Sequence, residues 1–81
     1  MWVRTNDKKY LLDATRFDIT KNLGGKKDEK WAIIAYSTSK FSDGGVICAC
    51  FPDKESAYGA LDKLSDAIRS QENYANIVYE F

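Results

Sequence analysis

Five residues near the N-terminus combine positive charge with aromatic rings, as a binding site for an anionic ligand requires. The cations are Arg4, Lys8 and Arg16, and the rings are Trp2 and Tyr10. A guanidinium grips phosphate or carboxylate through two parallel hydrogen bonds, and an aromatic ring offers a stacking face to a base. These five residues are therefore the expected ligand site. The alternative is that the arginines only pair with neighbouring aspartates on the surface, where each pair contributes under about 1 kcal/mol.

The two cysteines are the next candidates for chemistry. Cys48 and Cys50 stand two residues apart in an apolar segment, so both thiols of a regular strand would lie on one face. A zinc site needs two more ligands, and the chain has neither a histidine nor a third cysteine. A cysteine nucleophile would also lack its usual base. We expect two reduced, buried thiols and no bound metal.

Two further patterns fall short of a catalytic or phosphate-binding motif. Residues 24–27 read GGKK, but a phosphate loop would require glycine at Thr20 and serine or threonine at Lys27. The carboxylates of the N-terminal half do not have the spacing of a calcium-binding loop. No nucleophile–base pair is recognisable, so the sequence predicts a protein that is not an enzyme and carries no cofactor. The carboxylates considered are Asp7, Asp13, Asp18, Asp28 and Glu29.

A helix over 53–70 is the element with the strongest pattern. Asp53 is suited to cap its N-terminus, because a carboxylate there accepts a hydrogen bond from a free amide of the first turn. Gly59 costs about 1 kcal/mol relative to alanine, and we interpret it as a place where another backbone approaches. One apolar stripe recurs at helical spacing, and we expect Leu61 and Leu64 at its centre. The stripe comprises Ala57, Ala60, Leu61, Leu64, Ala67 and Ile68.

Alternating and apolar segments predict strands on both sides of this helix. Strands are expected over 1–5, 9–14, 31–36, 46–51 and 77–81. Residues 17–20 continue the second strand or form a short one, and a bend or bulge is expected over 13–16. The chain is thus one domain, 1–81, of the α+β class. We expect an antiparallel sheet of about five strands in ββββαβ order, with one amphipathic helix (53–70) packed on one face.

The segments 31–36 (WAIIAY) and 46–51 (VICACF) are apolar on both faces. A strand that is apolar on both sides is buried on both sides. One helix covers one face only, so sheet curvature, the loops or a second subunit must cover the other. We expect a homodimer, since twofold dimers are the commonest oligomers.

Charge and composition narrow the class of partner. The 81 residues carry no net charge, but residues 1–40 carry +4 (nine basic, five acidic) and residues 41–81 carry −4 (three basic, seven acidic). The halves either neutralise each other in the fold or leave a basic surface. Zero net charge argues against binding to duplex nucleic acid. There is no signal-peptide pattern and no run of membrane-spanning length, and two cysteines fit a reducing cytoplasm.

Three short motifs share their order and type with a known group of proteins. Residues 3–8 read VRTNDK before a leucine-containing strand, the helix opens with DKESA at 53–57, and a tyrosine-containing strand follows at 78–80. In these features the chain resembles small, mostly uncharacterised proteins of bacteriophages and prophages of Gram-positive bacteria. The resemblance implies a phage accessory protein and brings no catalytic residues with it.

The expected function is that of a non-catalytic phage counter-defence protein in the host bacterial cytoplasm. We expect it to sequester a host immune signalling nucleotide in a homodimer. One alternative is a protein–protein inhibitor of a host defence complex, similar to anti-CRISPR proteins in size, whose acidic C-terminal half mimics nucleic acid. The acidic residues are Asp62, Asp66, Glu72 and Glu80. Further alternatives are a small structural phage protein or a small enzyme.

Overall fold

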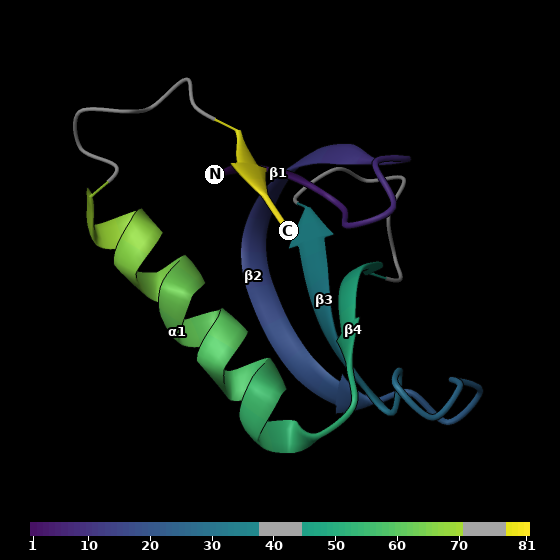
Figure 1. The fold of residues 1–81 in the computed structure, drawn as a ribbon. Helices are drawn as coiled ribbons and strands as arrows, with labels where there is room; N and C mark the ends of the chain where they lie inside the picture. The colour runs from purple at the N-terminus through teal and green to yellow at the C-terminus, as the bar shows by residue number, and fades with distance from the viewer. Residues whose placement is uncertain (38–44, 71–77) are drawn as a thin grey trace.

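Six elements follow one another in the order ββββαβ, so the expected α+β class is confirmed. The computed structural model describes residues 1–37, 45–70 and 78–81. Residue 77, where the last strand is expected to start, lies outside them. No helix in the described ranges has the length and apolar character needed to cross a bilayer. The elements are β1 (Trp2–Arg4), β2 (Leu11–Lys21), β3 (Trp31–Ser37), β4 (Val46–Phe51), α1 (Lys54–Arg69) and β5 (Tyr79–Glu80) (Figure 1).

The strands form one mixed sheet in the order β4-β3-β2-β1-β5. Neighbours from β4 to β1 pair antiparallel, whereas β5 lies parallel to β1, with Val3 opposite Tyr79. The expected sheet was antiparallel throughout, and only this last pairing differs. β5 is free to lie parallel to β1 because no hairpin joins the two strands: β5 follows α1 at the end of the chain, and only a tight hairpin would require antiparallel pairing.

β2 is a single long strand that bends along its length (Figure 1). It pairs with β1 near its start and with β3 along the rest. The register with β3 shifts between Ala14 and Arg16, so Thr15 is an extra residue. The bulge expected over 13–16 is therefore confirmed, and it supplies the local bend that curves the sheet.

The curvature brings the turn after β1 to the opposite edge of the sheet. β4 is separated from β1 by two strands in the sheet order. Nevertheless, the amide of Asn6 donates a hydrogen bond of 2.7 Å to the carbonyl of Cys48 in β4. The sheet is therefore curled so strongly that the turn after β1 meets β4 at this point.

The N-cap of α1 is the residue that the sequence predicts. The carboxylate of Asp53 accepts a hydrogen bond of 2.7 Å from the amide of Ser56, which satisfies a free donor of the first turn. Arg69 lies in the last turn, where a cation complements the helix dipole, and Ser70 is the C-cap.

The apolar stripe of α1 is shorter than expected. Ala57 and Leu64 are fully buried and Leu61 is half-buried, but Ile68 is 45% exposed. Beyond Leu64 the stripe is covered only in part, since Ala67 is half-buried and Ile68 is exposed. The interpretation of Gly59 is wrong, because a Cβ atom at this position would meet nothing within 4 Å.

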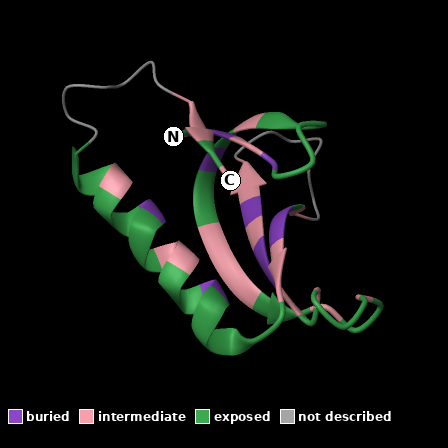
Figure 2. Cartoon of the chain, viewed as in Figure 1, coloured by how far each residue is buried: buried purple, intermediate pink, exposed green. Residues whose placement is uncertain are grey.

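The core fills the concave side of the sheet beneath α1. Figure 2 shows buried positions on β3, on β4 and on the side of α1 that faces them. Phe17 and Phe81 approach each other at 6.3 Å between ring centroids and extend this core toward β5. The buried cluster comprises Val3, Ala14, Ile33, Ala35 and Cys48.

The opposite face of β3 is covered in part within one chain. Gly45 lies so close to Ile34 and Tyr36 that a Cβ atom would collide with both side chains. β2 contributes the polar Asp18 beside Ile34. Ile47, the β4 partner of Ile34, remains 48% exposed. A small apolar area is thus left on the face that the sequence analysis assigned to a second subunit.

Candidate functional site

Arg4 and Lys8, two of the predicted ligand-binding cations, converge on one carboxylate of the same chain. Arg4 Nε lies 3.2 Å from Oε1 of Glu80, and Lys8 Nζ lies 2.6 Å from Oε2. The Lys8 ammonium, and secondarily the Arg4 guanidinium, lower the pKa of Glu80 below its usual value. Arg4 and Lys8 form what we call the anion clamp, and Glu80 of β5 occupies it.

The turn that carries Lys8 is fixed by Thr5 and Asp7. Thr5 is 1% exposed, and its hydroxyl donates to Asp7 while accepting a 3.2 Å hydrogen bond from the amide of Tyr10. Hydrogen bonds from the Thr5 hydroxyl and then the Lys9 amide lower the pKa of Asp7. Lys8 has a φ of 67°, which costs a non-glycine residue about 1–2 kcal/mol. The hydrogen bonds of the turn hold it there.

Arg16 lies away from the anion clamp. Its guanidinium is 3.2 Å from Asp18 and 4.2 Å from the centroid of the Tyr36 ring. It follows Leu11, the partner of Arg4, by five residues along β2, a distance of about 15 Å in extended chain. The bend in β2 therefore places Arg16 against β3 and not at the rim of the clamp.

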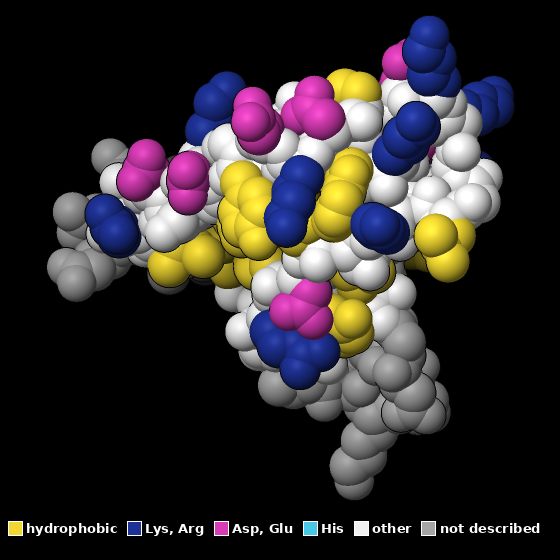
Figure 3. Space-filling view, turned by 90° about the horizontal axis from the view of Figure 1, so that it is seen from below, with side chains coloured by type: hydrophobic (Ala, Val, Ile, Leu, Met, Phe, Trp, Pro, Cys, Tyr) yellow, Lys and Arg dark blue, Asp and Glu magenta, His cyan; other side chains and the backbone are white. Residues whose placement is uncertain are grey.

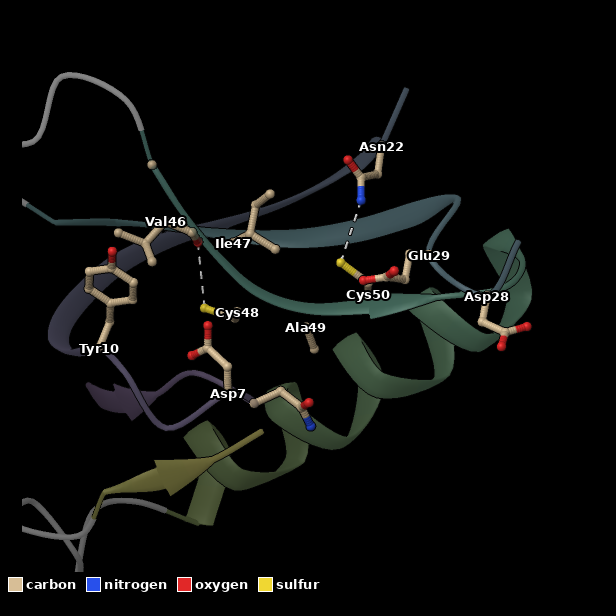
Figure 4. A pocket seen from close by; sticks show the side chains of 12 residues that line it. Asp7, Tyr10, Asn22, Asp28, Glu29, Val46, Ile47, Cys48, Ala49 and Cys50 are labelled. Atoms are coloured by element: carbon tan, nitrogen blue, oxygen red, sulfur yellow. Dashed lines mark hydrogen bonds between the residues drawn. The ribbon is translucent and has the colours of Figure 1, made fainter. Parts of the chain in front are cut away.

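The two predicted aromatic platforms lie on different sides of the hairpin. Trp2 is 43% exposed and stands two residues before Arg4 in β1, so the two side chains share a strand face. Tyr10 is 55% exposed and lies beside β4, close to Val46 and Cys48 (Figure 4). Of the five predicted residues, the structure brings Arg4 and Lys8 together at Glu80. Trp2 shares the strand face of Arg4, Tyr10 lies beside β4, and Arg16 pairs with Asp18 and Tyr36.

The two thiols point to opposite faces of β4, so the expectation that they lie side by side is wrong. The register of the β3–β4 pair shifts between Ile33 and Ile34, which leaves Cys48 as the extra residue of a bulge. Cys48 joins the core, and burial raises its pKa to about 11. Cys50 is half-buried, and its sulfur accepts a 3.6 Å hydrogen bond from Asn22. Burial raises the pKa of Cys50 as well, so both free thiols are protonated at neutral pH.

A second group of cations and rings lies where α1 begins. Lys54 Nζ lies 5.5 Å and Lys21 Nζ 5.8 Å from the ring centroid of Trp31. Lys54 Nζ is also 5.7 Å from the ring of Tyr58, one turn further along α1. We call these four residues the lysine–aromatic cluster. Figure 3 shows this end of the molecule, where basic side chains lie between and beside hydrophobic ones.

The lysines of this cluster differ from the cations of the hairpin in their partners. Within the described ranges, neither Lys21 nor Lys54 lies within ion-pair distance of a carboxylate. Asp53 neighbours Lys54 in the chain, but its carboxylate is directed to the amide of Ser56. Tyr58 is 48% exposed. Positive charge and a stacking surface therefore remain available to a ligand here.

The sequence analysis missed this cluster because its members come from three elements. Lys21 lies opposite Trp31 in the β2–β3 ladder, which becomes visible only when the hairpin register is known. Lys54 and Tyr58 stand four residues apart on α1, a spacing that places them on one helix face. That second signal was present in the sequence.

Comparison with known proteins reveals no relative. A scan against protein-family models, a search of the curated proteins and a search of the solved structures found no match. The function must therefore be argued from the residues of this chain.

Proposed function

We propose that this protein is a non-catalytic binding protein that captures a nucleotide at the lysine–aromatic cluster. The observation that carries the proposal is the arrangement of Lys21 and Lys54 around Trp31, with both ammonium groups unpaired in the described ranges. A nucleotide combines an aromatic base with a phosphate. It therefore matches a surface where rings and cations alternate.

Each part of the ligand has a matching group in the cluster. The exposed ring of Tyr58 offers a stacking face, and stacking on such a ring contributes about 1–3 kcal/mol per base. Lys54 lies between the rings of Trp31 and Tyr58, so its ammonium can move from ring to phosphate without a backbone change. Lys21 supplies a second charge from β2.

The chemistry of the remaining residues supports capture without turnover. The chain has no histidine, and burial keeps the Cys48 thiol protonated with a pKa of about 11. Within the described ranges no three acidic or cysteine side chains are grouped closely enough to hold a metal ion. A protein that binds a nucleotide without hydrolysing it acts by lowering the free concentration of that nucleotide.

The setting that we propose is phage counter-defence in a bacterial cytoplasm. The motifs at 3–8 and 53–57, which resemble those of phage accessory proteins, support it. In this setting the nucleotide is a host immune signal and the protein sequesters it as a homodimer. The exposed Ile47 on the face opposite α1 supports the dimer.

The anion clamp is the second candidate site for the same class of ligand. Its geometry supports anion binding, because Arg4 and Lys8 each contact one oxygen of a single carboxylate. A phosphate would have to displace Glu80, which lowers the affinity of this site relative to one whose cations are unpaired.

A fluorescence titration tests the proposal. In the Trp2→Phe variant, Trp31 is the one remaining tryptophan. We expect ATP, cyclic AMP or cyclic di-AMP to quench its emission through stacking in the cluster. Tyr58→Ala and Lys54→Ala should each weaken binding, by about 5- to 150-fold where about 1–3 kcal/mol of stacking is lost.

Two matched controls locate the site. Lys63→Ala removes another exposed lysine of α1 and should leave the affinity unchanged. Arg4→Ala should also leave it unchanged, whereas loss of binding in Arg4→Ala alone would move the site to the anion clamp. Mass spectrometry of heat-released small molecules, from protein purified out of bacteria, then identifies the natural nucleotide. If none of the three probes binds and no nucleotide is released, the proposed function is wrong.

A further inference from the structure

The four side chains of the lysine–aromatic cluster follow one another in alternating order. Lys21 Nζ lies 5.8 Å from the ring centroid of Trp31, and Lys54 Nζ lies 5.5 Å from the same centroid. Lys54 Nζ is also 5.7 Å from the ring centroid of Tyr58. The order is therefore ammonium, ring, ammonium, ring, in nearly equal steps. Figure 3 shows a basic side chain between two hydrophobic ones at this end of the molecule.

Strand pairing fixes the first half of this order. Lys21 and Trp31 are direct partners in the β2–β3 ladder, so their side chains lie next to each other on one face of the sheet. Trp31 is in turn the partner of Phe51, the last residue of β4. The position of Trp31 between β2 and β4 is thus set by strand register and needs no ligand.

The start of α1 fixes the second half of the order. Two residues, Pro52 and Asp53, separate the end of β4 from Lys54, the first residue of the helix. Proline restricts the backbone of this short link, and the capping hydrogen bond of Asp53 fixes the point at which the helix begins. Tyr58 follows Lys54 one turn later on the same helix face.

A single nucleotide uses only half of this arrangement. When its base stacks on the exposed ring of Tyr58, its phosphate meets Lys54, the ammonium next to that ring. Trp31 and Lys21 then have no partner in the ligand. One base cannot stack on both rings, because Lys54 lies between them.

Two nucleotides joined by a phosphodiester bond match all four groups. Their bases and phosphates alternate along the sugar–phosphate chain, as the rings and ammonium groups alternate in the cluster. Proteins that bind single strands use the same principle, since successive bases stack on successive aromatic side chains while cations follow the backbone. A duplex does not fit, because its bases are already stacked on each other and the chain carries no net charge.

We propose that the lysine–aromatic cluster binds two consecutive nucleotides joined by a phosphodiester bond. One base stacks on Tyr58 and the other on Trp31, while Lys54 pairs with the phosphate between them and Lys21 with the second phosphate. This inference rests on the proposed function and narrows its ligand from a nucleotide to a two-nucleotide unit. Linear dinucleotides, cyclic dinucleotides and single strands all present this unit.

Calorimetric titration with ligands that differ in their number of bases tests the inference. The probes are AMP, ATP and the linear diadenylate pApA, which carries two bases and two phosphates. We expect pApA to bind at least about fivefold more tightly than AMP, because the second base adds stacking on a second ring. It should also bind more tightly than ATP, although ATP carries more negative charge.

The possible results separate this inference from the proposed function. If ATP binds as tightly as pApA, charge decides the affinity, and the inference is overturned while nucleotide capture stands. If no nucleotide binds, the proposed function fails and this inference fails with it. An Asp-Phe-Asp-Phe peptide has the same alternation of charge and ring without a nucleotide. Binding of this peptide as tight as that of pApA would also overturn the inference.

Variants of the protein test the assignment of one base to each ring. In Tyr58→Ala one ring is lost, so the affinities for pApA and AMP should become about equal. Lys21→Ala should weaken binding of pApA more than binding of AMP. Lys27→Ala, which removes an exposed lysine of the loop after β2, should leave both affinities unchanged. A Tyr58→Ala variant that keeps the full preference for pApA would contradict the assignment and overturn the inference.

Two further ligands identify the source of the two-nucleotide unit. Cyclic di-AMP represents a free cyclic ligand, and a short single strand of deoxyadenosine nucleotides represents a nucleic acid. Tighter binding of either one than of AMP supports the two-nucleotide unit, and the tighter of the two names its source. If both bind more weakly than AMP, the cluster accepts a single nucleotide and the inference is overturned.

Discussion

At the scale of single residues, whether a cation can contact a ligand depends on whether a carboxylate of the same chain already pairs with it. Arg4 and Lys8 lie where the sequence suggests a ligand site, but Glu80 already occupies them. Lys21 and Lys54 are unremarkable in the sequence, yet they surround Trp31 without a carboxylate partner in the described ranges. A cation without a carboxylate partner is a better candidate for ligand binding than a cation that is already paired.

Thr5 is the residue on which the N-terminal turn depends. Among the described residues, Thr5 is the polar residue whose side chain is buried. Its hydroxyl donates a hydrogen bond to Asp7 and accepts one from the amide of Tyr10. In Thr5→Val the shape is kept but both partners lose a hydrogen bond, which should cost about 1–3 kcal/mol of unfolding free energy. Urea denaturation measures this cost.

Thr20→Val is the control for that experiment, because Thr20 is exposed in β2. It should change the free energy of unfolding by no more than about 0.5 kcal/mol. Equal effects of the two substitutions would show that the hydroxyl network does not stabilise the turn.

At the scale of elements, burial patterns differ most from expectation where a bulge or a helix end intervenes. The bulge in β4 turns Cys48 inward and Cys50 outward, although regular alternation would put them on one face. An open pocket separates the C-terminal half of α1 from β2, and Ile68 lines this pocket, so Ile68 stays exposed although it continues the apolar spacing. Periodicity assigns a residue to a face of its element, and the distance to the neighbouring element decides whether that face is covered.

The helix register gives a second prediction. Leu64 is 1% exposed, so Leu64→Ala should cost about 2–5 kcal/mol through lost burial and the cavity left behind. Ile68→Ala shortens a side chain that is 45% exposed, and it should cost under about 1 kcal/mol. Chemical denaturation of both variants checks this. A smaller loss for Leu64→Ala than for Ile68→Ala would contradict the packing of α1.

At the scale of the whole molecule, the two oppositely charged halves of the chain neutralise each other in part. The ion pairs of Arg4 and Lys8 with Glu80 join the basic N-terminal half to the acidic C-terminal half. The sheet also curls until Asn6 touches β4. Both features are contacts between distant parts of one chain. With the sheet curled in this way, less apolar surface is exposed than the two apolar strands, 31–36 and 46–51, imply.

The remaining apolar surface supports a third prediction, that of the homodimer. Ile47 is 48% exposed on the face opposite α1. Light scattering at micromolar concentration should give the mass of two chains, and Ile47→Lys should give the mass of one. Leu23→Lys is the control, because Leu23 is 93% exposed in the loop after β2 and should not affect assembly. A monomer mass for the unchanged protein would show that curvature and Gly45 suffice to cover the sheet.

The sequence by itself determined the elements, because capping, helical spacing and strand alternation act between residues close in the chain. Asp53 as N-cap, the bulge near Thr15 and the ββββαβ order all follow from such local rules. The direction of β5, the occupation of the anion clamp by Glu80 and the meeting of Lys21 with Lys54 were decided only by the tertiary structure. Each joins residues from distant parts of the chain, and register and sheet curvature, which no local pattern encodes, bring them together.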